Sequence, residues 1–287
     1  MKVKKSFYLL LPAACILSIT SFSQTSSGKL LLAKGQKIQI DNNVKTVSSQ
    51  DMMGQAVEIT LDANLIHEVV VKDKKANSYL LTSTLIKLST FGSAMGQELK
   101  FDSDKKEDLE SENGKALKDQ LNVTKELELD ESAKVIMGVK KDTGAIAGGQ
   151  LMDMINNVSF GNDESNGANA AFEVMPAGKK VGDSWSDSSI TEGMKTYRNY
   201  TFKEADGNNA TILLAGKQLT KKKLDLQGME VNINLEATLS GEGIVDMRTG
   251  LLKQRTMVME GTSTTEVMGQ SIPGTTKVTT TTTVKTI

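Results

Sequence analysis

The stretch Met229-Glu230-Val231-Asn232-Ile233-Asn234-Leu235-Glu236-Ala237 alternates strictly between apolar and polar side chains. Successive side chains of a strand point to opposite faces, so this pattern predicts a strand with one buried and one solvated face. Val57–Leu61, Leu99–Phe101 and Met194–Phe202 alternate in the same way. One-sided strands in succession are typical of antiparallel sheets, because parallel sheets are usually covered on both faces.

The segments between these strands carry turn-forming residues. Asp206–Asn209 and Asp246–Gly250 each separate two strand-like runs and contain Gly, Asn or Asp, which tolerate a left-handed backbone. Leu129–Val135 has a similar pattern in the N-terminal half. Thr275–Ile287 is rich in threonine, and we interpret it as a last strand, with a disordered tail as the alternative. Hairpins of this kind indicate a meander.

Helical patterns are scarce. Gln150–Phe160 is the best candidate, because its apolar residues fall on one helix face, and the charged stretch Asp102–Asp119 is a second. We therefore predict a mainly β protein whose antiparallel meander sheet curves into a half-barrel or open barrel, with one or two short helices. Its expected parts are a signal peptide (1–23), an N-terminal β half (24–148), a short helix and Gly/Asn-rich loop (149–171) and a C-terminal β half (172–287).

The first 24 residues have the pattern of a secretory leader. Three of the first five residues are lysine, an apolar run covers Phe7–Ile19, and small residues precede a cleavage point after Ser23. Lipidation at Cys15 and a retained membrane anchor are the two alternatives. A mature chain without cysteine differs from most eukaryotic secreted domains. We therefore expect a bacterial protein that is exported to the periplasm, the cell surface or the exterior.

Composition excludes several classes of function. Cleavage after residue 23 would leave 264 of the 287 residues, with 31 basic and 35 acidic side chains and a net charge of −4. The charges are interspersed, so there is no basic face for nucleic acid. The remaining chain has no thiol and a single histidine, His67, so thiol chemistry and histidine-rich metal sites are ruled out. His67 alternates with Leu65 and Val69, which indicates a buried structural residue.

Two short motifs invite a catalytic or metal-binding interpretation. Gly182-Asp183-Ser184-Trp185 has the Gly-Asp-Ser opening of one group of esterases, but no histidine follows residue 67 to act as the base. Asn162–Glu173 matches part of a calcium loop, although its first position is Asn rather than Asp. No two acidic residues stand out as a facing pair. The sequence therefore predicts no catalytic, cofactor-binding or metal-binding residue.

The stretch Phe172–Trp185, with Val181-Gly182-Asp183-Ser184-Trp185 at its end, resembles a family of exported bacterial proteins of unknown function. The resemblance extends to a later hairpin through Gly241, Gly243, Asp246, Thr249 and Gly250. It implies an envelope location and an all-β fold, and by looser fold analogy the curved sheets of LolA/LppX-like envelope lipid carriers. We predict that its short motifs are structural anchors, namely Trp185, Gly182, Asp183, Asp246 and Gly250.

Three functional hypotheses follow. The leading one is a non-enzymatic envelope protein that binds a lipid or another apolar ligand in the concave face of the sheet, because the strands are one-sided and rich in methionine. The alternatives are a scaffold protein with a fully packed core, acting on an envelope protein partner, and a hydrolase that uses carboxylates. Neither the ligand nor the oligomeric state follows from the sequence.

Overall fold

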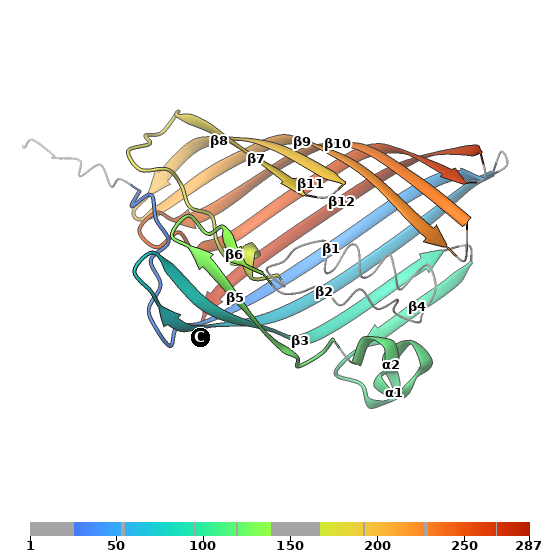
Figure 1. The fold of residues 1–287 in the computed structure, drawn as a ribbon, viewed down its shortest axis with the longest axis horizontal. Coiled ribbons are helices and arrows are strands. Elements are labelled where there is room, and N and C mark those ends of the chain that lie inside the picture. The colour runs from blue at the N-terminus through green and yellow to red at the C-terminus, as the bar shows by residue number, and fades with distance from the viewer. Residues whose placement is uncertain are drawn as a thin grey trace, which may run out of the picture.

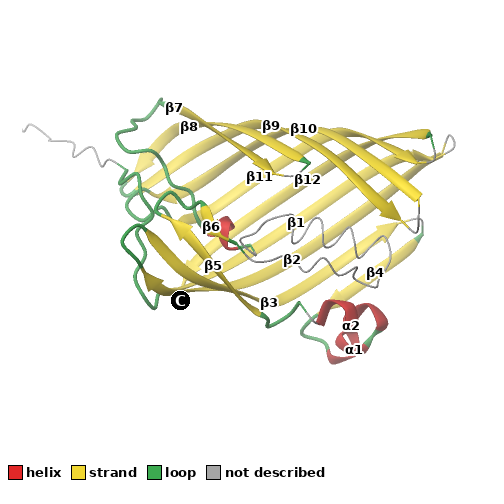
Figure 2. Ribbon diagram, viewed as in Figure 1, coloured by secondary structure: helices red, strands yellow, loops and turns green. Residues whose placement is uncertain are grey.

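The structure of the protein is a computed structural model that describes residues 26–52, 55–94, 96–118, 120–138, 167–191, 193–226, 229–267 and 269–287. Strands dominate these residues. The two short α-helices lie together at one corner, and a 3-10 turn lies apart from them (Figure 2). The N-terminal elements are β1 (Lys37–Met52), β2 (Gln55–Lys74), β3 (Ser78–Ala94), β4 (Gln97–Asp102), α1 (Lys106–Glu110), α2 (Glu112–Lys118), β5 (Thr124–Asp130) and β6 (Val135–Met137). The C-terminal elements are a 3-10 turn (Ala168–Ala171), β7 (Ser184–Thr191), β8 (Met194–Asp206), β9 (Asn209–Leu226), β10 (Met229–Asp246), β11 (Leu252–Val267) and β12 (Gln270–Thr286).

All twelve strands form one antiparallel sheet (Figure 1). The order is β6-β5-β3-β2-β1-β12-β11-β10-β9-β8-β7, with β4 also paired to β3. The threonine-rich C-terminus is β12, which lies in the middle of the sheet and pairs with both β1 and β11. The prediction of a last strand is confirmed, and this strand joins the N-terminal and C-terminal halves. The edges at β6 and β7 are not paired with each other, so the curved sheet stays open.

The two faces of the sheet differ in burial, as the alternation predicts. In β2, Leu61, Ala63, Leu65, His67 and Val69 are buried, while the residues between them are partly or fully exposed. We call the face that carries these buried residues the inner face and the opposite one the outer face. The two ends of the strand order curl over the inner face, which is therefore the concave one (Figure 1).

Four glycines explain why the sheet bends so strongly. Gly216, Gly241, Gly261 and Gly274 lie on the inner face of the consecutive strands β9, β10, β11 and β12. A Cβ atom at these positions would lie 2.3, 2.6, 2.5 and 2.9 Å, respectively, from a carbonyl oxygen of a neighbouring strand. Only glycine permits such a close approach of two backbones. The line of glycines therefore lets the C-terminal half roll inward, a device that curved sheets commonly need.

The N-terminal strap, residues 26–32, closes one end of the concave face. The Leu30 N–H donates to the carbonyl of Glu131 in the β5–β6 turn at 2.6 Å. The Leu31 N–H donates to the carbonyl of Thr249 in the β10–β11 turn at 2.9 Å. The strap thus connects turns from the two halves of the chain. The side chain of Leu30, in the middle of the strap, is fully buried.

Buried apolar side chains form three clusters on the inner face. The first lies at the strap and includes Leu30, Tyr79 and Phe172. The second lies under the charged stretch that was predicted to hold a helix, where Leu117 of α2 and Leu121 pack against β2, β3 and β4. The third covers β8–β11 around Phe202. The short helix expected within Asp102–Asp119 is confirmed as α1 and α2.

The predicted turns are present. The Leu129–Val135 hairpin is formed by β5 and β6, and Gly207 between β8 and β9 has a positive φ of 56°. The predicted leader 1–23, the predicted helix Gln150–Phe160 and the first half of the Asn162–Ala171 loop, residues 162–166, lie outside the described residues. The end of that loop is the 3-10 turn, which packs into the strap cluster through Ala168 and Ala171.

Candidate functional site

In β10, β11 and β12, several apolar side chains of the inner face are less buried than those at the strap end. At the strap end, residues such as Ile38, Ile40 and Leu81 are fully buried. Toward the opposite end, the inner-face residues Met259, Val278, Leu235, Ile233 and Ile272 are only half-buried. Met259 and Val278 are direct partners across β11 and β12, whereas Gly261, Ser263 and Thr265 of β11 separate them from the other three residues. Partly accessible apolar side chains on a concave face are candidate ligand contacts. We call these five residues the apolar strip and treat it as part of the candidate site.

The predicted anchor Trp185 sits on the edge strand β7 and is half-buried. Its indole stacks on the ring of Tyr200, with a centroid separation of 5.3 Å and an interplanar angle of 9°. The Lys179 ammonium lies 5.9 Å from the centroid of the same indole. Gly182 has a φ of 95°, and the Asp183 carboxylate accepts from the Lys180 N–H at 2.8 Å. This turn thus directs Trp185 toward Tyr200 on the inner face.

The predicted anchors Asp246 and Gly250 form the turn between β10 and β11. The Asp246 carboxylate accepts from the Arg248 N–H at 2.9 Å, and Gly250 has a φ of 72°. The carbonyl of Gly250 accepts from the Glu173 N–H at 2.9 Å. This turn, which also contacts the N-terminal strap, therefore fixes the backbone of Glu173 over the inner face.

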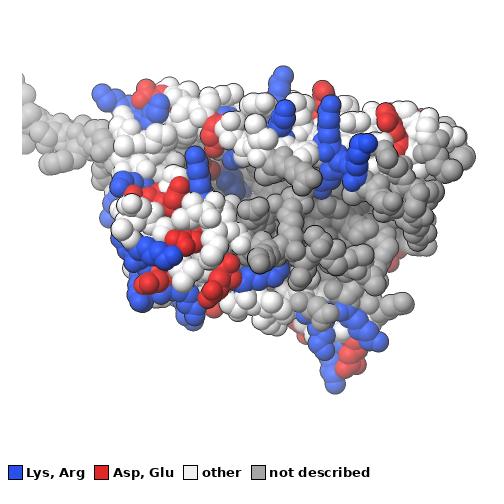
Figure 3. All heavy atoms as spheres, in the orientation of Figure 1, with Lys and Arg blue, Asp and Glu red and all other residues white. Residues whose placement is uncertain are grey.

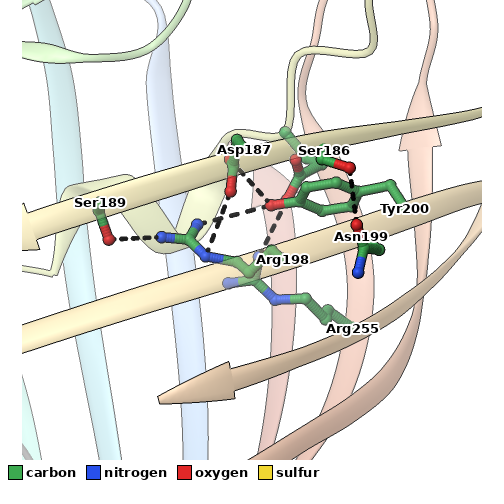
Figure 4. A network of polar contacts seen from close by, with 8 residues as sticks. Ser186, Asp187, Ser189, Arg198, Asn199, Tyr200 and Arg255 are labelled. Atoms are coloured by element: carbon green, nitrogen blue, oxygen red, sulfur yellow. Dashed lines mark hydrogen bonds and ion pairs between the residues drawn. The ribbon is translucent and has the colours of Figure 1, made fainter. Parts of the chain in front are cut away.

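Beside the apolar clusters lies a group of charged side chains from β7 and β8 (Figure 4). Arg198 contacts Asp187 through Nε at 3.6 Å and donates from Nη2 to the Ser189 hydroxyl at 3.0 Å. The Tyr200 hydroxyl donates to Asp187 at 3.2 Å. Burial raises the pKa of Tyr200, with the nearby Glu173 carboxylate adding to the effect. Arg198 Nη1 also donates to the Tyr200 hydroxyl at 3.5 Å, so each of the three guanidinium nitrogens of Arg198 has a partner.

A second ion pair joins Arg255 of β11 to Glu173. The distance between Arg255 Nη1 and Glu173 Oε2 is 3.3 Å, and the two side chains are 22% and 18% exposed. Burial raises the pKa of Glu173, although Arg255 and Arg198 act in the opposite direction. We call Glu173, Asp187, Arg198, Tyr200 and Arg255 the charged cluster. It places two guanidinium groups and two carboxylates on the concave face, beside the third apolar cluster.

The charged cluster was missed by the sequence analysis, yet the sequence carries a signal for it. Arg198 occupies the same face as Tyr200 and Phe202 in an alternating strand, so it interrupts an inner-facing apolar series. The chain also contains only three arginines among its 34 basic residues, namely Arg198, Arg248 and Arg255. The strand register places two of the three, Arg198 and Arg255, on the inner face. A guanidinium presents five donors in a planar fork, whereas an ammonium is a compact point charge.

His67 is buried on the inner face as predicted, with 2% exposure. Its Nδ1 has no hydrogen-bond partner among the described residues, and desolvation lowers the pKa of the imidazole to about 4. Within the same residues, no three His, Cys, Asp or Glu side chains gather as a metal site would require. Of the calcium-like pattern, Asn162–Asn166 lie outside the described residues, and Glu173 is paired with Arg255.

The outer face is predominantly polar, as Asn232, Asn234 and Glu236 of β10 and Glu260 and Thr262 of β11 illustrate. On the side of the molecule from which the concave face opens, Lys and Arg side chains are interspersed with Asp and Glu, and no large area of one sign is seen (Figure 3). A shallow groove of about 370 Å³ crosses β1–β4, lined by residues that include Lys45, Asp62 and Phe91. Lys45 and Asp62 already form an ion pair at 3.5 Å. We therefore regard the inner face as the better candidate site.

Residues 76–252, more than half of the chain, match the Family of unknown function (DUF6263). The chain belongs to this family. The matched range contains the predicted anchors and most of the charged cluster, with Arg255 just beyond its end. No curated protein gives a significant match to this DUF6263 member.

Solved structures show what the fold of this DUF6263 member is similar to. A lipovitellin structure titled "Lipid-protein interactions in lipovitellin" aligns with a TM-score of 0.51 at 12% identity over 89% of this chain. The aligned part is 25% of the lipovitellin chain, so this protein spans about a quarter of that relative. At this identity, the likeness concerns the fold alone.

Two further structures align less well. An outer membrane channel from Pseudomonas putida F1 has a TM-score of 0.26 at 9% identity, over 90% of this chain and 98% of that one. OccK5 (OpdH) of Pseudomonas aeruginosa has a TM-score of 0.25 at 4% identity, over 89% of this chain and 99% of that one. These scores are too low to support an argument. In the part of the chain that is described, no helix is long and apolar enough to cross a membrane.

Proposed function

We propose that this DUF6263 member is an exported bacterial envelope protein that binds a lipid or another apolar ligand on the inner face of its sheet. The observation that carries the proposal is the apolar strip. These side chains lie on the concave side of an open sheet, from the middle of β11 and β12 to the end away from the strap, and are only half-buried. A concave apolar surface beside a few convergent polar groups is the usual form of a small-molecule site.

Two further features support this proposal over a scaffold. The strip contains or adjoins methionines, among them Met257 and Met259, whose flexible thioethers fit ligands of varied shape. The sheet resembles that of lipovitellin, whose structure title refers to lipid–protein interactions. A scaffold would instead fill this region with its own side chains, as the strap end is filled.

A binding experiment tests this proposal. The protein is purified as residues 24–287 and titrated with an uncharged apolar fluorophore, followed by native mass spectrometry for co-purified lipid. We expect saturable fluorescence enhancement that hexadecanol reverses. Met259→Glu places a charge in the strip and should abolish the enhancement. The matched control is Val258→Glu, because this neighbouring side chain points to the outer face. A cooperatively melting protein that binds no apolar probe would favour the scaffold.

The export part of the proposal has a separate test. The chain is expressed with its leader in a bacterium, and the envelope fraction is analysed by N-terminal sequencing and intact mass. We expect Gln24 as the first residue and no lipid. A diacylated Cys15 at the N-terminus would instead show a lipoprotein.

A further inference from the structure

Arg255 has hydrogen-bonding capacity that the described residues do not use. A guanidinium carries five N–H donors, and the contact of Arg255 with Glu173 at 3.3 Å engages one of them. The side chain lies on the inner face of β11 and is 22% exposed, so part of it remains accessible. Arg198 differs, because Asp187, Ser189 and Tyr200 all contact its guanidinium. Arg255 is therefore the member of the charged cluster that can accept another partner.

The surroundings of Arg255 are apolar. Its neighbour on the same face of β11 is Met257, which packs with Leu252 and Val284 in the third apolar cluster. Met259 of the apolar strip follows two residues later along the same face. Farther along β11 the inner-face residues are Gly261, Ser263 and Thr265, so the apolar surface beside Arg255 is formed by Met257 and Met259 with Leu239 and Val278 on the neighbouring strands. A molecule whose apolar part lies on this surface reaches the guanidinium with its polar end. This juxtaposition of one cation and an apolar surface matches an amphiphile with an anionic head group.

Glu173 occupies the place that an external anion would take. It makes a single contact with Arg255, whereas a carboxylate and a guanidinium can form two parallel hydrogen bonds. Its burial raises the pKa of the carboxyl group, which makes its charged form costly. A ligand carboxylate that enters from the inner face can therefore compete with Glu173 for Arg255.

We infer that Arg255 is the specificity-determining residue of the inner-face site and that it selects amphiphiles with an acidic head group, such as long-chain carboxylic acids, in competition with Glu173. The inference rests on the proposed apolar ligand and adds the chemistry of its polar end. The use of arginine in a chain where lysine supplies nearly all other basic residues agrees with this role, because a guanidinium matches the two oxygens of a carboxylate.

The test compares hexadecanoic acid with hexadecanol as competitors of the uncharged fluorophore. For the wild-type protein, we expect the acid to bind about tenfold tighter than the alcohol, as a charge-assisted hydrogen bond permits. Arg255→Gln should remove this preference without weakening the binding of hexadecanol. Glu173→Gln should strengthen the binding of hexadecanoic acid at least about threefold, because the competing carboxylate is gone. Acetate serves as a second competitor and should displace nothing.

The controls separate the inference from the proposed function. Arg248→Gln changes an exposed arginine of the β10–β11 turn and should leave the acid preference intact. Thermal melting of each variant identifies loss of folding. Equal binding of acid and alcohol by the wild type, or an unchanged preference in Arg255→Gln, would overturn the inference while the apolar site stands. If the wild type binds neither compound, both the inference and the proposed function are wrong.

Discussion

The hydroxyl of Tyr79 donates a hydrogen bond of 2.7 Å to the carbonyl oxygen of Leu30. Both residues are almost completely buried, with exposures of 1% and 0%. This bond attaches the N-terminal strap to β3, while the strap backbone contacts the turns of both halves. A connection this deep in the core indicates that residues 26–32 are part of the folded domain.

The Tyr79–Leu30 bond leads to a first prediction. Tyr79→Phe leaves the Leu30 carbonyl buried without its partner and should lower the free energy of unfolding by about 1–2 kcal/mol. Chemical denaturation measures the change. Tyr197→Phe is the matched control, because that side chain is 47% exposed and should tolerate the loss of its hydroxyl. Equal stability of the two variants would show that the strap is not held by this bond.

The line of inner-face glycines leads to a second prediction. Gly241→Ala places a Cβ atom 2.6 Å from the Thr256 carbonyl oxygen, so β10 and β11 must separate. We expect a loss of about 1–3 kcal/mol of unfolding free energy, as for other overpacked sites. Gly243→Ala is the control on the same strand and face, because its Cβ would have ordinary contacts at 3.5 Å. A similar loss in both variants would argue against the proposed cause of the curvature.

The pH dependence of stability is the third prediction. Burial lowers the pKa of His67 to about 4 from 6.5, so the folded state keeps the imidazole neutral where the unfolded chain binds a proton. Stability from this residue is therefore complete above pH 6.5 and is lost as the pH falls toward 4, by up to about 3 kcal/mol. Denaturation curves across this range measure the slope.

His67 is the only histidine, so His67→Gln should remove the contribution of histidine protonation to the pH dependence of stability. The raised pKa of Glu173 opposes it, because protonation of that carboxyl group favours the folded state. The quantity to compare is therefore the difference between the wild type and His67→Gln at each pH. A difference that stays constant between pH 4 and 6.5 would contradict the assigned burial.

Trp185 is the subject of the fourth prediction. It stacks on Tyr200 but keeps part of its surface exposed, so Trp185→Ala should cost about 1–3 kcal/mol of unfolding free energy, less than a fully buried aromatic residue. Trp185→Phe keeps a stacking ring and should cost less. As the only tryptophan, it reports its environment directly by fluorescence. Emission of a fully solvated indole in the folded protein would disprove the stacking.

Much of the fold was predictable because it depends on local patterns. Alternation in Met229–Ala237 and the glycine of the Asp246–Gly250 turn indicated the strands and hairpins that the structure contains. The threonine-rich C-terminus was recognised as a strand from its composition. A side-chain period of two and a positive φ are properties of a few neighbouring residues, so they can be read from the chain.

The sequence by itself determined which residues form one-sided antiparallel strands, because apolar and polar side chains separate onto two faces wherever they alternate. Only the tertiary structure decided how those strands curve and what meets on the concave side. The pairing of β1 with β12 joins segments at the two ends of the described chain, and the strap links turns more than a hundred residues apart. Glu173 and Arg255 form an ion pair across 82 residues. Such contacts depend on the register and bending of the whole sheet, and no local pattern specifies those.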